Sequence, residues 1–582
     1  MNINEIIEHA IDRYWNWRLL DIPEFATFVG EHKYDDRLMD MSLNGYLRRR
    51  DDARAWLDEA RKIRKLTHAD PPSNECKIHL DYLELEVFLD GLSYQTYLCP
   101  MNPTDGPHIR FPRLISWMKK GSVEDFNMIT RRFRQVTVQV GQMIELMTEG
   151  IRLQKTVHLN IIQTYPTMLE EFIEKVADDP LHSLRAPFVE KPELISYQDW
   201  DQIVNEGNKL LDQFVMPAFK SLKIFIEEEY IPKARHSHLP KDLYEAYVRF
   251  HTERDITPEW IFKTGQEKIK NLLPKLDEQQ KKIGFKGTRR EFLDHLRTDA
   301  MFAFTSREEM VEVYTSECQR VYGLLSKIFS KYPKMPYEII QAPKEIEKHY
   351  CVGAYVAGDN SKDRPGLFIL NTYSPPNRKR YDIPAIILHE ALPGHHIQLA
   401  LTAESGLKDY RRFADELRWW DLPAHVGMKS SYHEGWATYA EFLGHELGLY
   451  DDVYTQIGSI SRNIELACRY VVYVGLHVQG WSREKAIEFM LDNTAVDAFE
   501  VETEVDRYSS LPAQSLAYLY GSEKFKEYRK KAEKALGDQF NVKTFHTMLC
   551  SLGDVPLFIV EGQVDKYIYC LLYTSPSPRD RG

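Results

Sequence analysis

Helix-start signals followed by apolar residues at three- and four-residue spacings recur along most of this chain, and they constrain its fold more than any other feature. Ser122, Thr288 and Ser306 each stand three positions before an acidic residue, which is the form of a capping box. Thr257 precedes a proline, and Ser482 precedes another such run. Because the apolar spacing matches the helical period, we predict a mainly α-helical protein.

The helical pattern is interrupted between residues 349 and 371. Two short β-prone runs flank a polar turn there, and the second run covers Leu367 to Leu370. The pattern predicts a small β-hairpin or sheet. An exposed strand edge can hold an extended peptide by backbone hydrogen bonds. We therefore expect the strand ending at Asn371 to contact substrate, with Asn371 as a substrate-binding residue.

Composition narrows the class of protein. The 582 residues are 43% hydrophobic and 28% charged, which is typical of a globular protein. The net charge of −12 contains no basic block, and this argues against a nucleic-acid or anionic-membrane partner. The seven cysteines form no C-x-x-C pair, as is common for reduced thiols. With no signal-peptide pattern and no membrane-span pattern, we expect a soluble cytoplasmic protein.

The segment "ILHEALPGHHIQ", residues 387–398, is similar to a zinc-binding helix but has the wrong spacing. In the usual H-E-x-x-H motif, two histidines one turn apart share a face. On a continuous helix His389 and His395 would point to different sides. His389 and His396 would share a face but lie ~10 Å apart along the axis. Neither pair could then bind one ion.

A Pro-Gly pair inside the segment offers a solution. Pro393 cannot donate the hydrogen bond that the carbonyl four residues earlier would accept, and Gly394 relaxes the backbone further. If the pair bulges out, His395 takes the position of the second histidine, and Glu390 becomes the general base beside the metal. The alternative is a helix that stops at Leu392 and is followed by two surface histidines.

A third ligand is expected from the segment "SSYHEGWATYAEFLGHELG". Glu434 fits this role, since two histidines and a glutamate hold zinc in several peptidases. Glu441 lies on the same helix face and could instead accept a hydrogen bond from a ligand histidine. Both carboxylates could simply be solvated, but the aromatic residues around them (Tyr432, Trp436 and Tyr439) indicate a mostly buried helix.

The segment "EVDRYSSLPAQSLAYLYG" supplies further candidates for catalysis and substrate binding. Tyr518 could stabilise the oxyanion of a tetrahedral intermediate. Arg507 could pair with a substrate carboxylate, and Gln514 could contact the substrate. Aromatic residues at helical spacing usually belong to the core, and the same holds for His477 in "VGLHVQGWS".

Several segments together resemble the bacterial family grouped as domain of unknown function 885, which is regarded as zincin-like. They are "RPGLFILNTY", "LHEALPGHHIQLAL", "EGWATYAE", "GLHVQGWSREKAIEFM", "EVDRYSSLPAQSLAYLYG" and "LGDQFNVKTFHTMLCSLGDVPL". The resemblance covers nearly the whole chain up to about residue 568. It implies His389, His395 and Glu434 as metal ligands and Glu390 as the base, and it makes the Pro-Gly insertion part of the pattern.

The chain departs from the family pattern at several positions. Tyr473 stands where an aspartate usually precedes the histidine of "GLH", so a carboxylate that would orient His477 is missing. Ala513, Ser515 and Leu519 replace the usual glycine, alanine and lysine of P-G-Q-A-L-x-Y-K. A substrate contact that the lysine could make is therefore lost, while the metal motif is intact.

The resemblance extends to carboxypeptidase Taq and the oligopeptidases. It implies a mainly α, two-lobed, zincin-like helical clamp around a deep channel, with a small β-sheet or hairpin beside the metal helix. We expect a helical N-terminal lobe over residues 1–340 and a zincin-like catalytic region over residues 341–571. Residues 572–582, rich in Ser, Pro and Arg, are similar to translated adapter sequence, and we expect a non-native tail.

The function predicted from these features is zinc-dependent hydrolysis of short peptides. Glu390 would take a proton from the attacking water, and Tyr518 would stabilise the oxyanion. Two alternatives stay open: hydrolysis of an amide in a small metabolite, and a catalytically silent binding or scaffold protein of the same fold. Iron or manganese would also suit the ligands, though zinc suits them best. A homodimer is an open alternative for the oligomeric state.

Overall fold

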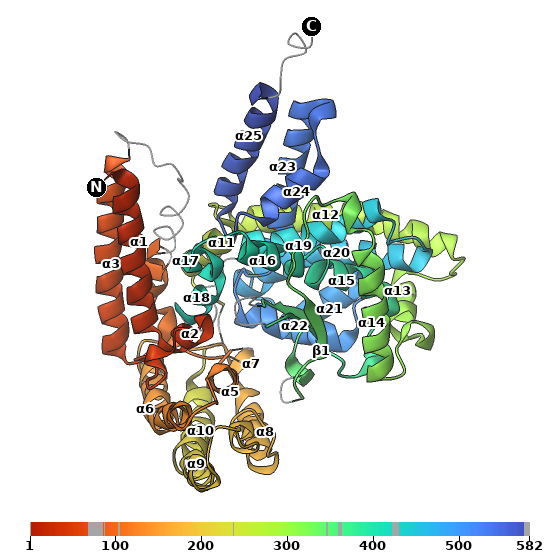
Figure 1. The fold of residues 1–582 in the computed structure, drawn as a ribbon. Coiled ribbons are helices and arrows are strands. Elements are labelled where there is room, and N and C mark those ends of the chain that lie inside the picture. The colour runs from red at the N-terminus through yellow and green to blue at the C-terminus, as the bar shows by residue number, and fades with distance from the viewer. Residues whose placement is uncertain are drawn as a thin grey trace. The chain divides into compact units, whose positions relative to one another are not determined.

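The computed structural model describes residues 2–67, 85–86, 88–102, 105–236, 238–344, 347–358, 364–421 and 430–574 (Figure 1). The chain forms two compact units. The first contains Met1–Ser237 and Phe413–Met428, and the second contains His238–Arg412 and Lys429–Gly582. Both units consist mainly of helices, and one small sheet lies in the second. The prediction of a mainly helical protein with a small sheet is confirmed.

The first unit is entirely helical in its described part, around a core of apolar side chains from α5, α6, α8, α9 and α10. Its helices are α1 (Ile3–Asp21), α2 (Pro23–Val29), α3 (Leu43–Leu66), α5 (Pro107–Trp117), α6 (Val123–Arg152), α7 (Leu159–Ile162), α8 (Tyr165–Asp178), α9 (Tyr197–Leu210), α10 (Met216–Phe225) and α18 (Ala414–Asp421).

The second unit holds the metal-binding motif and the sheet. Its helices are α11 (Lys241–Thr252), α12 (Pro258–Lys282), α13 (Arg289–Thr298), α14 (Arg307–Tyr322), α15 (Ile383–Glu390), α16 (His395–Glu404), α17 (Asp409–Arg412), α19 (Ser430–Leu447), α20 (Val453–His477), α21 (Arg483–Asn493), α22 (Ala498–Ser510), α23 (Leu516–Leu536), α24 (Val542–Cys550) and α25 (Leu557–Thr574). Residues 572–574 of the expected tail belong to α25, and its remainder lies outside the described residues.

The helix starts lie where the sequence predicts them. Ser122 and Thr288 form complete capping boxes with the acidic residue three positions on. Thr257 caps α12 ahead of its proline, and Ser482 caps α21. Ser306 caps α14 through the backbone of Glu309, whose carboxylate binds Thr305 instead of closing the box. Side chains that accept these first N–H groups fix where each helix begins.

The boundary between the units lies at residues 237 and 238, not at the expected residue 340. The reason is tertiary packing, because α12 packs along α20 and α14 packs against α15 and β1 (Tyr337–Gln341). The helices from α11 to α14 therefore belong to the unit that holds the metal-binding motif. Helical periodicity specifies an apolar face but not its partner, so the sequence does not show this assignment.

The sheet has three strands in the order β1-β3-β2. The predicted hairpin is present, with β2 (Gly353–Val356) antiparallel to β3 (Gly366–Leu370). The strand β1 adds a parallel partner on the other side of β3. The prediction that the strand ending at Asn371 holds substrate is therefore wrong, because β3 is the central strand and both of its edges are paired.

Two glycines bring α19 and α23 into close contact. A Cβ atom on Gly435 would lie 2.5 Å from the Cα atom of Gly521, and a Cβ atom on Gly521 would lie 2.2 Å from the Ser431 carbonyl oxygen. Because side chains at these positions would force the helices apart, the pair sets their spacing. Glu434 on α19 and Tyr518 on α23 lie within one turn of this contact.

Two further sequence expectations can be compared with the structure. The described cysteines (Cys99, Cys318, Cys351, Cys468, Cys550 and Cys570) are free thiols. Within the described ranges, the helices lack the combination of length and apolarity that crossing a membrane requires.

Candidate metal centre

The candidate metal-binding segment consists of two helices joined by a tight turn. The helix α15 ends at Glu390, residues 391–394 form the turn, and α16 begins at His395. The peptide bond between Leu392 and Pro393 is cis. The expected interruption at the Pro-Gly pair is present, although the helix ends and restarts instead of bulging by two residues. This break allows His395 to face His389, with ring centroids 4.9 Å apart.

Gly394 is required by close packing of the turn against α15. A Cβ atom at this position would lie 1.8 Å from the carbonyl oxygen of His389 and 2.4 Å from that of Leu388. Real Cβ atoms do not approach backbone oxygens so closely, and here the obstacle is backbone of a helix and not a flexible side chain. The last turn of α15 can therefore be approached this closely only by glycine.

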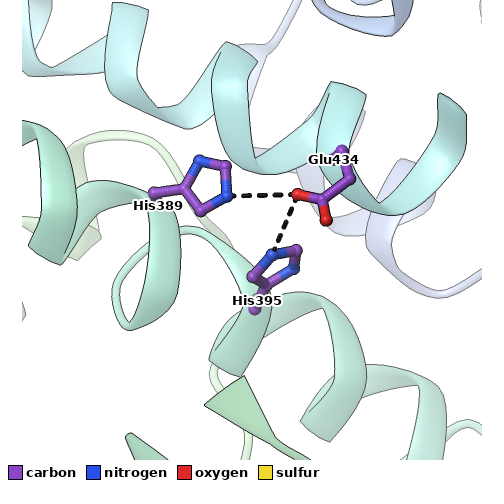
Figure 2. A group of neighbouring side chains, drawn as sticks. All are labelled: His389, His395 and Glu434. Atoms are coloured by element: carbon purple, nitrogen blue, oxygen red, sulfur yellow. Dashed lines mark hydrogen bonds and ion pairs between the residues drawn. The ribbon is translucent and has the colours of Figure 1, made fainter. Parts of the chain in front are cut away.

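Three side chains from α15, α16 and α19 converge on one point (Figure 2). The Nε2 atom of His389 lies 3.2 Å from Oε2 of Glu434, and Nε2 of His395 lies 3.5 Å from the same oxygen. One ligand atom from each residue lies within 4.8 Å of the other two. The predicted ligand set is thus brought together by residues that are up to 45 positions apart.

The spacing of these atoms fits one tetrahedral ion. Zinc lies about 2.1 Å from nitrogen and oxygen ligands, so two ligand atoms at a tetrahedral angle are about 3.4 Å apart. The two measured separations from the Glu434 oxygen, 3.2 and 3.5 Å, are close to this value. Two imidazoles and one carboxylate also form a donor set that zinc prefers, and they leave a fourth position open.

The other nitrogen of His389 is held by Glu441. Its Nδ1 atom lies 2.8 Å from Oε1 of Glu441, and this contact leaves Nε2 to face Glu434. Arg462 on α20 donates to the same carboxylate from Nε, at 3.3 and 3.4 Å. The alternative role considered for Glu441, an acceptor from a ligand histidine, matches this geometry. Such contacts fix the tautomer and the ring orientation of a metal-binding histidine.

Without a metal, hydrogen bonds stabilise the charged forms of His389 and Glu434. Burial disfavours the charged form of His389, but hydrogen bonds to Glu434 and Glu441 outweigh it and raise its pKa to about 10. Burial similarly opposes ionisation of Glu434, yet hydrogen bonds from His389 and His395 hold its pKa well below the usual value. A cation bound here would take the place of a proton that His389 otherwise carries.

Glu390 lies at the C-terminal end of α15 and is only 9% exposed. Burial raises the pKa of its carboxyl group, and the positive charges of His389 and His395 partly oppose the shift. The strand β2 packs beside it, since a Cβ atom on Gly353 would lie 3.1 Å from Cγ of Glu390. A carboxylate with a raised pKa next to a ligand cluster is suited to accept and return a proton.

Tyr518 on α23 completes the cluster. Its hydroxyl donates to Oε1 of Glu434 at 2.8 Å, and its ring stacks on the His389 ring with centroids 5.8 Å apart. The Arg469 guanidinium lies 4.8 Å from the centre of the Tyr518 ring. Burial and the Glu434 charge raise the pKa of Tyr518 well above its ordinary value. The phenol is therefore a protonated donor beside the metal ligands.

The predicted substrate-binding residues are engaged within the protein. Arg507 donates to both oxygens of Glu504 at 2.8 and 2.7 Å and to Oε1 of Gln514 at 2.9 Å. Gln514 is buried and donates to the hydroxyl of Ser430 at 3.1 Å. The Gln514 amide therefore connects α22, through Arg507, to α19, through Ser430, just before the start of α23.

Asn371 has a structural role. It is fully buried, and its amide nitrogen donates to the carbonyls of Glu347 and Tyr350, each at 2.8 Å. Its side-chain oxygen accepts from the backbone of Tyr373 at 2.9 Å. The prediction that Asn371 binds substrate is wrong, because every part of the amide closes the loops beside the sheet.

His396 and His477 do not belong to the cluster of His389, His395 and Glu434. His396 is buried, and its Nδ1 lies 2.8 Å from the hydroxyl of Tyr355 on β2. Burial lowers the pKa of His396 to about 4, so it is neutral. His477 is also buried, stacks on the ring of Tyr244, and its Nε2 lies 2.9 Å from the Tyr508 carbonyl.

The backbone of Ala513 explains one departure from the family pattern. Its φ is +64°, which lies in the left-handed region that favours glycine. The resemblance expects glycine at this position. The chain thus keeps the conformation of the loop before α23 with a residue that adopts it at a cost.

Sequence reasoning missed the contact of Arg462 with Glu441 and the position of β2 beside Glu390. Arg462 stands among polar residues of α20 (Ser461, Asn463 and Glu465), so the residues around it contain no signal of a buried partner. Gly353 and Tyr355 carried no such signal, because their importance comes from the position of β2 beside Glu390 and His396.

The family described as "Bacterial protein of unknown function (DUF885)" matches residues 23–564. No curated protein sequence matches. A "putative lipoprotein" from Colwellia psychrerythraea has a similar structure, with a TM-score of 0.80, 22% identity, and 94% of this chain and 96% of that chain covered.

A second solved structure, a "putative lipoprotein of unknown function" from Shewanella oneidensis, has a TM-score of 0.61 and 16% identity. The match covers 97% of this chain and 99% of that chain. At these identities the two structures show a shared fold. The family match extends over most of the chain, so this protein belongs to the DUF885 family.

Proposed function

We propose that this protein is a zinc-dependent peptidase. The observation that carries the proposal is the convergence of His389, His395 and Glu434, whose spacing and chemistry suit a tetrahedral ion with one position left for water. When bound there, zinc supplies a Lewis acid that lowers the pKa of water and polarises a carbonyl group.

Glu390 is the proton carrier in this proposal. It accepts a proton from the attacking water and returns it to the leaving nitrogen, which restores the carboxylate at the end of the cycle. The burial that raises its pKa makes the carboxylate a stronger base than an exposed glutamate. Its position directly after His389 places it at the end of the helix that carries the first ligand.

Tyr518 is the proposed donor to the oxyanion. Its hydroxyl is already directed at the ligand cluster, where it donates to Glu434 at 2.8 Å. As a neutral phenol it can donate to the oxygen that gains negative charge during attack. The Arg469 guanidinium on its ring favours this donation by its positive charge.

Peptides are favoured over other amides because a strand edge lies beside Glu390. Within the described residues β2 has one paired side, toward β3. The backbone N–H of Asn371 donates to the carbonyl of Val352. In an antiparallel pair the hydrogen-bonded residues alternate, so the backbone groups of Gly353 and Tyr355 point away from β3. An extended peptide could pair with this edge and present its carbonyl group near Glu390.

The test is hydrolysis of a peptide library and a matched library of N-acyl amino acids by zinc-loaded protein. The proposal expects peptide cleavage that Glu390→Gln lowers by roughly 10²–10⁴-fold while bound zinc is unchanged. Cleavage of acyl amino acids alone would favour the amide hydrolase of small metabolites. No cleavage of either library, with zinc bound, would favour a silent binding protein.

The cytoplasmic location stays a prediction, and both similar structures are named lipoproteins.

A further inference from the structure

A polar cavity lies beside Glu441, two helix turns along α19 from Glu434. It is enclosed by α19, α20 and α23 and has a volume of about 330 Å³ including the space at its mouth. The residues that matter for its chemistry are Thr438, Glu441, His445, Ser459, Arg462 and Lys526. Glu434, Thr438, Glu441 and His445 follow one face of α19, so the cavity extends from the metal site toward the helix end.

The inner end of the cavity is formed by Arg462, whose guanidinium is shared between Glu441 and Glu465. Its contacts with Glu441 are 3.3–3.4 Å long, at the weak end for hydrogen bonds, while one shorter bond of 2.9 Å goes to Glu465. A guanidinium has five N–H donors, so donors remain for a further acceptor. Glu441 is already shared between Arg462 and His389.

The mouth of the cavity is basic. Lys526 lines it with a side chain that is 32% exposed and has one ion pair, to Glu523 at 3.1 Å. Burial lowers the pKa of His445, and the positive charges of Lys526 and Lys275 lower it further. Lys526 and Lys275 thus place positive charge near His445, although Glu523 balances part of the Lys526 charge.

One wall carries a buried hydroxyl group that needs a partner. Thr438 is 5% exposed, and its Oγ1 has no hydrogen-bond partner among the described residues. The Ser459 hydroxyl nearby lies 3.1 Å from Nε2 of His445 and is also hydrogen-bonded to Tyr450. A buried hydroxyl without a partner is costly, so a group with acceptor oxygens would stabilise this wall.

We propose that this cavity binds a small inorganic oxyanion such as phosphate. Arg462 contacts it at the inner end, the hydroxyl of Thr438 donates from the wall, and Lys526 neutralises charge at the mouth. A tetrahedral anion with several acceptor oxygens can satisfy these donors together, which a halide with one acceptor atom does less well.

The site has a consequence for metal binding, which rests on the proposed function. An anion that draws Arg462 away from Glu441 leaves that carboxylate a stronger acceptor from His389, and the imidazole then becomes a better ligand. The anion's own charge acts in the same direction on a nearby cation. We expect phosphate to tighten zinc binding roughly fivefold, and zinc to tighten phosphate binding by the same factor.

The experiment is calorimetric titration of the metal-free full-length protein with inorganic phosphate, sulfate and chloride. The expected result is saturable phosphate binding that Thr438→Val weakens roughly fivefold and Lys526→Gln roughly tenfold. Lys524→Gln is the matched control, because Lys524 lies on the same helix and pairs with Glu527 outside the cavity. Thermal unfolding of each variant checks that it is folded. If Lys526→Gln is unfolded, the test rests on Thr438→Val, which keeps the side-chain shape.

Three outcomes would overturn the site: no saturable phosphate binding in the millimolar range, equal affinity in Thr438→Val and the parent protein, or chloride binding as tightly as phosphate. The titration uses no metal and no substrate. A protein that binds phosphate at this cavity but neither holds zinc nor cleaves peptides would therefore contradict the proposed function and leave the anion site standing.

Discussion

The Nδ1 nitrogen of His389 lies 2.8 Å from the Oε1 atom of Glu441, so a carboxylate on α19 sets the orientation of the first proposed metal ligand on α15. Glu441→Gln keeps the shape but removes the charge and weakens the pairing with Arg462. We expect zinc affinity to fall by roughly 10–100-fold, the usual effect of losing such a contact. Competition with a chelator measures it. Glu446→Gln on the same helix is the control, and equal zinc affinity in Glu441→Gln and the parent protein would contradict this role.

Tyr518→Phe removes the hydroxyl that donates to Glu434 and leaves the ring on His389. If this hydroxyl stabilises the oxyanion, kcat should fall by roughly 10²–10³-fold, with a small change in KM and full zinc content. Steady-state kinetics on a cleaved peptide provide the measurement, with Tyr520→Phe on the same helix as the control. A change in KM alone would assign Tyr518 to substrate binding instead.

Gly394→Ala tests the turn between the two metal helices. The new methyl group would meet the His389 carbonyl at 1.8 Å, and the backbone must move to relieve it. We expect a loss of at least roughly 2 kcal/mol in the free energy of unfolding, together with loss of zinc binding. Gly562→Ala in α25 is the control, because a Cβ atom there meets nothing within 4 Å. Denaturant unfolding compares the two, and similar stabilities would show that the turn tolerates a side chain.

We predict that titration of Glu500 makes the stability of the protein depend on pH. Burial raises the pKa of Glu500 to about 7, with help from Glu465 and Glu504 and against Arg378. Between about pH 4.5 and pH 7 the native state keeps a proton that the unfolded chain releases, so stability falls as pH rises through this window. We expect the free energy of unfolding to fall by about 2 kcal/mol over this window. This is less than the full pKa shift would give, because the side chain is 29% exposed.

Glu500→Gln should remove this part of the pH dependence. Denaturant unfolding at pH 5 and pH 8 compares the variant with the parent protein, and exposed Glu488→Gln serves as the control. The same loss of stability between the two pH values in Glu500→Gln and the parent would show that Glu500 does not titrate in this range.

Much of the local structure could be predicted from the sequence. Capping side chains such as Ser122 and Thr288 mark helix starts because they satisfy N–H groups within one turn, and this information is local. The hairpin of β2 and β3 is also local. The proximity of His389, His395 and Glu434 could be predicted because the motif and the family resemblance carry spacing information for a metal site.

Features that depend on long-range packing could not be predicted. The parallel pairing of β1 with β3 joins segments about thirty residues apart, and it changes which strand has a free edge. Asn371 was predicted to contact substrate, but its amide instead binds the backbone carbonyls of Glu347 and Tyr350, which are distant in the sequence. The contact between Arg462 and Glu441 depends on how α19 and α20 pack, which the helical period of each does not specify.

The most direct test of the central claim is the metal content of the purified protein, measured by mass spectrometry beside three variants. We expect near-stoichiometric zinc in the parent protein and in Glu390→Gln, and loss of zinc in His395→Ala and Glu434→Gln. Zinc that persists in His395→Ala would contradict the three-residue centre formed across the Pro-Gly turn. A parent protein that binds no metal, even after incubation with zinc, would contradict both the proposed metal centre and the proposed peptidase function.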